Sequence, residues 1–98
     1  MPKTKTRKYD AAAYLKSEKD CAAYLQAAMD EADGEPSVIV AALGDIARAR
    51  GMMQLAKETG LTREGLYKAL SPDGNPSFAT VMKVAAALGL RIQASPAR

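Results

Sequence analysis

Apolar residues recur at intervals of three and four along most of the chain, which is the spacing of a buried helical face. The clearest such face lies in residues 36–50 and predicts a helix there. It consists of Ile39, Ala42, Leu43, Ile46 and Ala47. The same period predicts a helix over 18–32, two short helices within 52–70, and a fifth helix after Ser77. The pattern therefore predicts an all-α fold of five helices.

Residues with strong local preferences mark the ends of these helices. Ser17 is followed three positions later by Asp20, which forms a near capping box with Asp in place of Glu. Pro36 suits the first turn of the second helix. Gly51 is expected to end that helix with a left-handed cap, and Gly60 to form the hinge between the two short helices.

The fifth helix is expected to start after a cap provided by Ser77 or Asn75 and to stop at Gly89. Its predicted inward stripe is Phe78, Val81, Met82, Ala85 and Leu88. Val84 and Ala87 lie off that stripe, so we expect them to contribute to a contact between subunits.

Beyond Gly89, apolar Leu90 and Ile92 alternate with polar Arg91 and Gln93, as in a short β-strand. A strand this short needs a partner, which the same segment of a second subunit would provide. We therefore expect a homodimer.

The 98 residues, of which 48% are apolar, suffice for one modest core. We divide the chain into a flexible basic N-terminal arm (1–16), an N-terminal helix (17–35), a compact helical domain (36–90) and a C-terminal tail (91–98). Aromatic residues are few, so the core must consist mainly of Leu, Ile, Val, Met and Ala. This composition suits closely packed helices.

The segment MMQLAKETGLTREGLYKAL (52–70) has the spacing of a helix-turn-helix. Small Ala56 allows close packing, Gly60 allows the turn, and the leucines can point to one core. The opposite face is polar and would be offered to the major groove of DNA. It comprises Thr62, Arg63, Glu64, Tyr67 and Lys68. The alternative is an ordinary helical hairpin whose outer face is polar only because it meets water.

Residues suited to catalysis or metal binding are scarce. The chain has no His, and its single Cys excludes an internal disulfide. Cys21 lies in an apolar periodic stretch, so we expect a buried side chain and not a nucleophile. We expect no enzymatic activity, no metal, no cofactor and no small-molecule ligand. No segment resembles a signal peptide or approaches the ~20 apolar residues of a membrane span, so we expect a cytoplasmic protein without membrane contact.

The net charge of +3 is unevenly distributed. Residues 1–10 carry +3 and residues 46–98 carry +5, whereas residues 11–45 carry −5. The predicted helix-turn-helix thus lies in a basic half, which favours contact with the phosphate backbone. Scattered lysines and arginines on a helical surface can also serve only for solubility.

After residues 52–70 come the turn SPDGNPSF and the amphipathic run SFATVMKVAAALG, an order that resembles the lambda-repressor-like, Xre-type helix-turn-helix family. The stretch from about Val38 to Leu90 is similar to the addiction-module antidote proteins, the HigA-like antitoxins of bacterial toxin–antitoxin pairs. This resemblance implies direct binding and neutralisation of a small toxin that cleaves messenger RNA. It also implies repression of the protein's own operon through its operator DNA.

The resemblance implies that the polar residues of 62–68 form the recognition helix, with Gln54 and Asn75 as phosphate or backbone contacts. Arg63 can bind guanine O6 and N7, and Lys68 can reach a phosphate or a guanine. Thr62 can cap the helix while it meets a phosphate or a thymine methyl group. Glu64 and Tyr67 suit a DNA contact and a purely structural role equally. Many members begin the motif with Gln, where this chain has Met52, which puts a phosphate contact there in doubt.

A toxin that acts on RNA is expected to be basic, and the acidic stretch 11–45 is its electrostatic complement. Its densest acids are Asp30, Glu31, Asp33 and Glu35. The alternative is that these side chains belong to a solvated helix end and turn. The runner-up function is a stand-alone transcriptional repressor of the same fold without a toxin partner.

Overall fold

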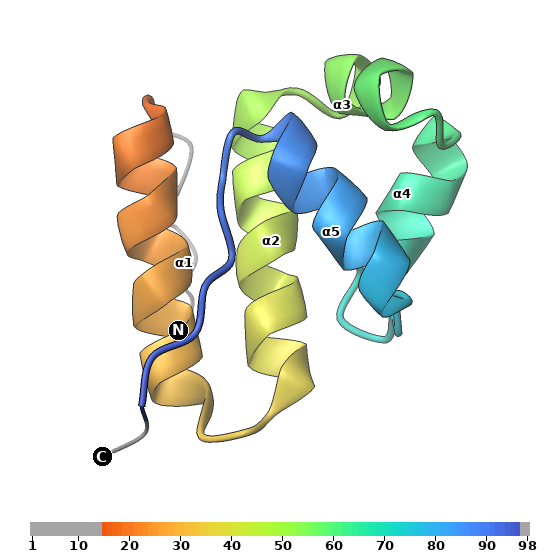
Figure 1. Cartoon of the computed structure of the whole chain (residues 1–98). Coiled ribbons are helices and arrows are strands. Elements are labelled where there is room, and N and C mark those ends of the chain that lie inside the picture. The colour runs from red at the N-terminus through yellow and green to blue at the C-terminus, as the bar shows by residue number, and fades with distance from the viewer. Residues whose placement is uncertain (1–14, 97–98) are drawn as a thin grey trace, which may run out of the picture.

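The computed structural model describes residues 15–96, so most of the predicted N-terminal arm lies outside the described residues. These residues form five helices, which confirms the all-α prediction (Figure 1). The helices are α1 (Glu18–Ala32), α2 (Pro36–Arg50), α3 (Met52–Thr59), α4 (Arg63–Ala69) and α5 (Phe78–Ala87).

Short side-chain caps start three of these helices. The Ser17 hydroxyl accepts a hydrogen bond from the Asp20 backbone N–H at 3.1 Å, as the near capping box predicts. Thr62 and Ser77 cap α4 and α5 in the same way. Such a bond satisfies one of the backbone donors left unpaired at a helix start. Pro36 occupies the first turn of α2, as expected.

The connection between α2 and α3 differs from the prediction. Gly51 has φ 111° and ψ 109°, which is a positive φ outside the left-handed helical region. The physical reason is that this one residue both ends α2 and precedes α3, so the chain must change direction there without a separate cap. Gly60 does take the predicted left-handed conformation, with φ 77° and ψ 9°.

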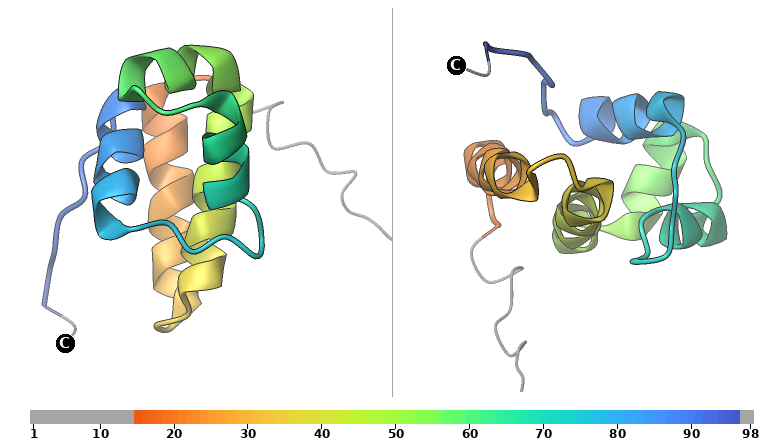
Figure 2. Two further views of the ribbon diagram at one scale, coloured as in Figure 1. Left: turned by 90° about the vertical axis from the view of Figure 1, so that its right-hand side faces the viewer. Right: turned by 90° about the horizontal axis from the view of Figure 1, so that it is seen from below.

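The helices α1 and α2 run antiparallel and side by side, joined by a short turn (Figure 1). Viewed along this pair, α4 and α5 lie on the side of α2 away from α1 (Figure 2). The short helix α3 contacts α2, α4 and α5 at one end of the molecule. The helix α2 therefore lies between α1 and the α3–α4–α5 group.

The core is built around α2, whose Leu43, Ile46 and Ala47 are entirely buried. The other helices each contribute buried apolar side chains to the same cluster. Among them are Cys21, Leu25, Leu55, Leu66 and Val84. Leucine, isoleucine, valine and alanine dominate this cluster, in agreement with the composition.

The inward face of α5 was predicted only in part: Ala85 and Leu88 are buried and Val81 packs against the core, as expected, but other positions differ. Val84 and Ala85 are buried, so Val84 is not available for a contact between subunits. Phe78 is 72% exposed and Met82 is 41% exposed, although both were assigned to the inward stripe. The reason is that α5 is apolar on nearly every face, so several helical stripes fit its sequence equally well. Packing against the rest of the core selects the face that contains Val84.

The strand predicted in the C-terminal tail does not form: residues 90–96 are neither strand nor helix. The Leu90 backbone N–H donates to the Ala85 carbonyl at 2.8 Å, and the Leu90 side chain is buried. Ile92 is half-buried and packs against the same core. The two apolar side chains that suggested a strand thus serve the core of their own chain.

Gly44 allows the close approach of α2 to the end of α4. A Cβ atom at this position would lie 2.8 Å from the carbonyl oxygen of Leu70. Leu70 is itself buried, so the backbone around it has little freedom to move. A side chain at position 44 would push α4 away from the centre of the core.

We predict that Gly44→Ala lowers the free energy of unfolding by about 1–3 kcal/mol, through overpacking against Leu70. The sign of this change in the free energy of unfolding is informative, because Gly→Ala at an open helical site stabilises a protein by roughly 0.5–1 kcal/mol. Urea denaturation followed by circular dichroism measures the effect. The control is Ala41→Gly on the exposed side of α2. It should lower the free energy of unfolding only by the difference in helix propensity between Ala and Gly. A stabilised Gly44→Ala protein would show that α2 and α4 are not in close contact.

Candidate functional site

A rigid turn of three residues joins α3 to α4. The Thr59 hydroxyl donates to the Leu55 carbonyl at 2.8 Å and accepts from the Leu61 N–H at 3.3 Å. The Gly60 N–H donates to the Ala56 carbonyl at 3.0 Å. The turn's polar groups are thus bonded to the last turn of α3, which fixes the direction in which the chain enters α4.

One side chain anchors α4 to the core. Leu66 is completely buried, and it is the buried residue of this seven-residue helix. The five side chains predicted to face a DNA groove all lie on the exposed surface around it. They are Thr62, Arg63, Glu64, Tyr67 and Lys68. The structure therefore brings the predicted recognition residues together on one outer face.

Two of these side chains also contact each other. The guanidinium carbon of Arg63 lies 5.7 Å from the centre of the Tyr67 ring, in a cation–π arrangement. Tyr67 remains 42% exposed, so its hydroxyl can still reach another molecule. The contact places the Arg63 guanidinium over the ring of a residue one turn further along α4.

Thr62 combines a structural role with exposure. Its Oγ1 accepts a hydrogen bond from the Gly65 N–H at 2.9 Å and thereby caps α4. The hydroxyl hydrogen is not used in this bond and can be donated to an external acceptor such as a phosphate oxygen. Glu64 lies in the first turn of α4, where the helix dipole favours a negative charge.

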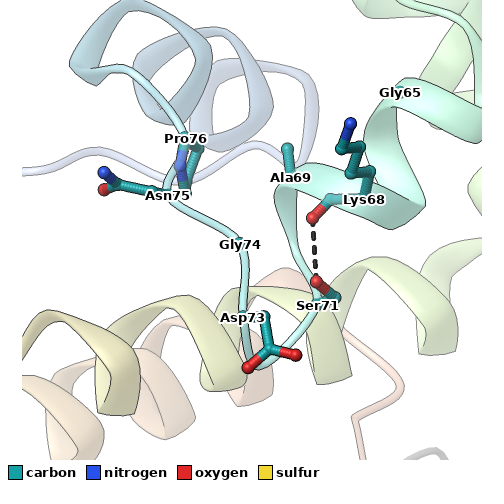
Figure 3. A pocket seen from close by; sticks show the side chains of 8 residues that line it. All are labelled: Gly65, Lys68, Ala69, Ser71, Asp73, Gly74, Asn75 and Pro76. Carbon is teal, nitrogen blue, oxygen red and sulfur yellow. Dashed lines mark hydrogen bonds between the residues drawn. The ribbon is translucent and has the colours of Figure 1, made fainter.

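Asn75 joins this surface through a hollow of about 360 Å³ beside the end of α4 (Figure 3). Lys68 borders the hollow from α4, and Asn75 borders it from the loop between α4 and α5. The loop is held in place by the Ser71 hydroxyl, which donates to the Lys68 carbonyl at 2.9 Å. The predicted contacts Lys68 and Asn75 therefore belong to the same surface.

The other residues that line this hollow were not singled out from the sequence, and Asp73 and Gly74 are the most informative of them. Asp73 adds an acidic residue to the lining that Lys68 shares. Gly74 lies so close to the end of α4 that a Cβ atom would collide with the carbonyl oxygens of Lys68 and Ala69. The Gly within the turn cluster was a signal for such close approach, but the sequence does not identify which helix it approaches.

The structure places Gln54 apart from the α4 surface. Its side-chain amide donates to the Glu58 carboxylate at 3.0 Å on the same helix. It lines a different hollow, together with Glu18 and Arg50. The Gln54 amide is thus engaged by Glu58, and the charged groups around it are of both signs.

The four acids predicted to meet a toxin are all exposed, but their surroundings differ. Asp30 accepts a hydrogen bond from Gln26 at 3.1 Å, and Glu35 accepts one from Ser37 at 3.0 Å. Asp33 ends α1 with a positive φ of 51°. Glu31 borders a hollow between α1 and α2.

Cys21 is buried, as the apolar pattern around it predicts. Burial raises the pKa of its thiol above the ordinary value, because a thiolate is poorly solvated there; nearby Arg50 opposes this shift. The neutral thiol is a weak nucleophile at physiological pH. Across residues 15–96, no group of three or more His, Cys, Asp or Glu is arranged to hold a metal ion.

None of the helices in the described part of the chain combines the length and apolar character that crossing a membrane requires.

Comparison with known proteins identifies the family. The family model described as probable addiction module antidote protein matches residues 5–96. An uncharacterized protein of Haemophilus influenzae is 52% identical over 90 residues, which cover 92% of this chain and 91% of that protein. The comparison with solved structures gives no match. By the extent of the family match, this chain belongs to the family of probable addiction module antidote proteins.

Proposed function

We propose that this antidote protein neutralises a small, RNA-cleaving toxin by binding it directly, and represses its own operon by placing α4 in the major groove of operator DNA. The exposed face of α4 is the observation that carries the DNA-binding half of the proposal. It presents Arg63 and Lys68 from a helix held by a rigid turn. Family membership supports the antidote half.

The chemistry of the α4 surface suits base and phosphate recognition. Arg63 offers a planar pair of donors that matches guanine O6 and N7, and the Tyr67 ring already holds its position. Lys68 and Asn75 border one hollow, from which both can reach the same stretch of phosphate backbone. Thr62 can donate its hydroxyl hydrogen to a phosphate. Gln54 is outside the proposed contact set, because its amide is bonded to Glu58 and it lines a different hollow from Lys68 and Asn75.

Charge supports the same assignment of surfaces. Residues 46–98 carry eight basic and three acidic side chains, whereas residues 15–45 carry two basic and seven acidic ones. The DNA-facing half is therefore positive, and the half that contains α1 is negative. A basic toxin is attracted to the negative half and repelled by the positive one.

A second copy of the chain is the proposed partner for the exposed face of α5. We define the α5 stripe as Phe78, Met82 and Ala86, which follow one another at intervals of four and are all exposed. Burying the exposed part of Phe78 would stabilise a contact by about 1–2 kcal/mol, and burying that of Met82 by about 1 kcal/mol. Since α5 follows α4 after a short loop, an α5-mediated homodimer would hold two α4 helices in a fixed relation, as a two-fold symmetric operator requires.

We predict that Arg63→Ala weakens binding to the operator by about 1–3 kcal/mol and relaxes the base preference at one position. A gel-shift series on the promoter region of the operon, with single-base variants, measures both quantities. Lys68→Ala is the matched comparison, because the loss of a phosphate contact lowers affinity for all sequences and reduces the salt dependence. Unchanged affinity and base preference in Arg63→Ala would remove Arg63 from the reading surface.

We predict that the product of a small basic reading frame beside this gene co-purifies with the protein. Expression of that product alone should arrest growth, and co-expression of this protein should restore it. Pull-down with a tagged antidote, followed by mass spectrometry, measures the complex. Operator binding without any toxic neighbour or complex would favour the stand-alone repressor.

We predict that the double variant Phe78→Ser and Met82→Ser is monomeric but folded, because both side chains are exposed in the single chain. Light scattering measures the mass, and circular dichroism checks the helix content. The control is Met53→Ser, which removes an exposed methionine from α3, away from the α5 stripe. A double variant that stays dimeric would place the subunit contact elsewhere.

A further inference from the structure

A hollow of about 390 Å³ lies between α1 and α2. Both helices contribute side chains to its lining. These include Tyr24, Ala28 and Glu31 from α1, and Val38, Ala41 and Asp45 from α2. The surface of the hollow is mainly apolar, yet a carboxylate stands on each helix. It is separate from the α4 surface, because α4 lies on the other side of α2 from α1 (Figure 2).

Alanine side chains explain why the two helices leave space here. Ala28 of α1 and Ala41 and Ala42 of α2 end at Cβ, so nothing from them fills the groove between the helices. Val38 borders the same space and is one of the large apolar side chains that remain exposed in the described part of the chain. An aliphatic or aromatic side chain from another molecule would gain apolar contact with these residues.

The two carboxylates of the hollow differ in their hydrogen bonds and ion pairs. Asp45 accepts a hydrogen bond from the Tyr24 hydroxyl at 2.6 Å and pairs with Arg48 at 3.0 Å. These bonds fix Asp45 and join α1 to α2. Within residues 15–96, no hydrogen bond or ion pair engages the Glu31 carboxylate. The Glu31 carboxylate is therefore available to form an ion pair with a cationic side chain of another molecule.

We propose that this hollow, with Glu31 beside it, is the docking site for a basic segment of the toxin. An apolar side chain of that segment enters the space between α1 and α2, and a neighbouring Lys or Arg pairs with Glu31. Charge complementarity carries the choice of occupant, because residues 15–45 have a net charge of −5. The inference rests on the proposed antidote function and names the surface that performs it.

A second copy of the chain is a less suitable occupant of the hollow. A two-fold contact through this face would bring the acidic half of one chain against the acidic half of another. Like charges brought together in this way repel each other and disfavour association. The α5 stripe, by contrast, contains no charged side chain.

The test compares four variants of the full-length protein in titration calorimetry against the purified product of the neighbouring toxin gene. Ala41→Arg fills the hollow from an exposed position, and Glu31→Lys reverses the open charge. Each should weaken the complex about tenfold or more. The controls are Glu58→Lys, the same charge reversal at an exposed position of α3 away from the hollow, and Ala23→Arg on an exposed position of α1 outside the lining. Both controls should stay within about twofold of the unmodified protein.

Each outcome separates the inference from the proposed function. If the unmodified protein fails to bind the toxin, the proposed function itself is wrong. If it binds and the two hollow variants bind equally well, the toxin docks elsewhere and the inference is wrong. If the two hollow variants change only the oligomeric mass of the free protein and bind the toxin normally, the hollow is a contact site for a second copy and the inference is wrong. All variants should retain operator binding, which checks that α4 is intact.

Discussion

The burial of α2 between α1 on one side and the α3–α4–α5 group on the other is the constraint on which the rest of the structure depends. Leu43, Ile46 and Ala47 are entirely shielded from solvent, so they hold the elements on both sides in fixed positions. Gly44 allows the end of α4 to approach α2 directly. Leu66 is the buried anchor of α4, so this packing turns the helical face opposite Leu66 toward solvent.

Most of the fold could be predicted from the sequence because the helix boundaries depend on local chemistry. Ser17, Pro36 and Thr62 act through hydrogen bonds or backbone geometry within a few residues, so their effect is the same in any tertiary context. The buried face of α5 could not be predicted in this way. Its apolar residues surround the helix, and only distant contacts decide that Val84 turns inward and Phe78 outward.

The candidate site shows the same division between local and distant causes. The outward face of α4 follows from helical spacing, and all five residues expected there are exposed. The association of Lys68 with Asn75 and Asp73 depends on how the loop after α4 returns to that helix, which no local pattern encodes. Gln54 was assigned to the DNA surface by its place in the motif. Its actual neighbours, Glu18 and Arg50, come from α1 and α2, and their proximity is likewise a product of tertiary packing.

The distribution of charge over this framework links the two proposed activities. If a basic toxin occupies the hollow beside Glu31, it neutralises the acidic half of the protein and leaves the α4 surface uncovered. The complex then carries more net positive charge than the free antidote, and its affinity for the phosphate backbone rises without any change in the shape of α4. By thermodynamic reciprocity, operator DNA must then strengthen toxin binding by the same factor. Because the buried side chains of α2 hold α4 and the hollow in fixed positions, this coupling would be electrostatic and would weaken as salt increases.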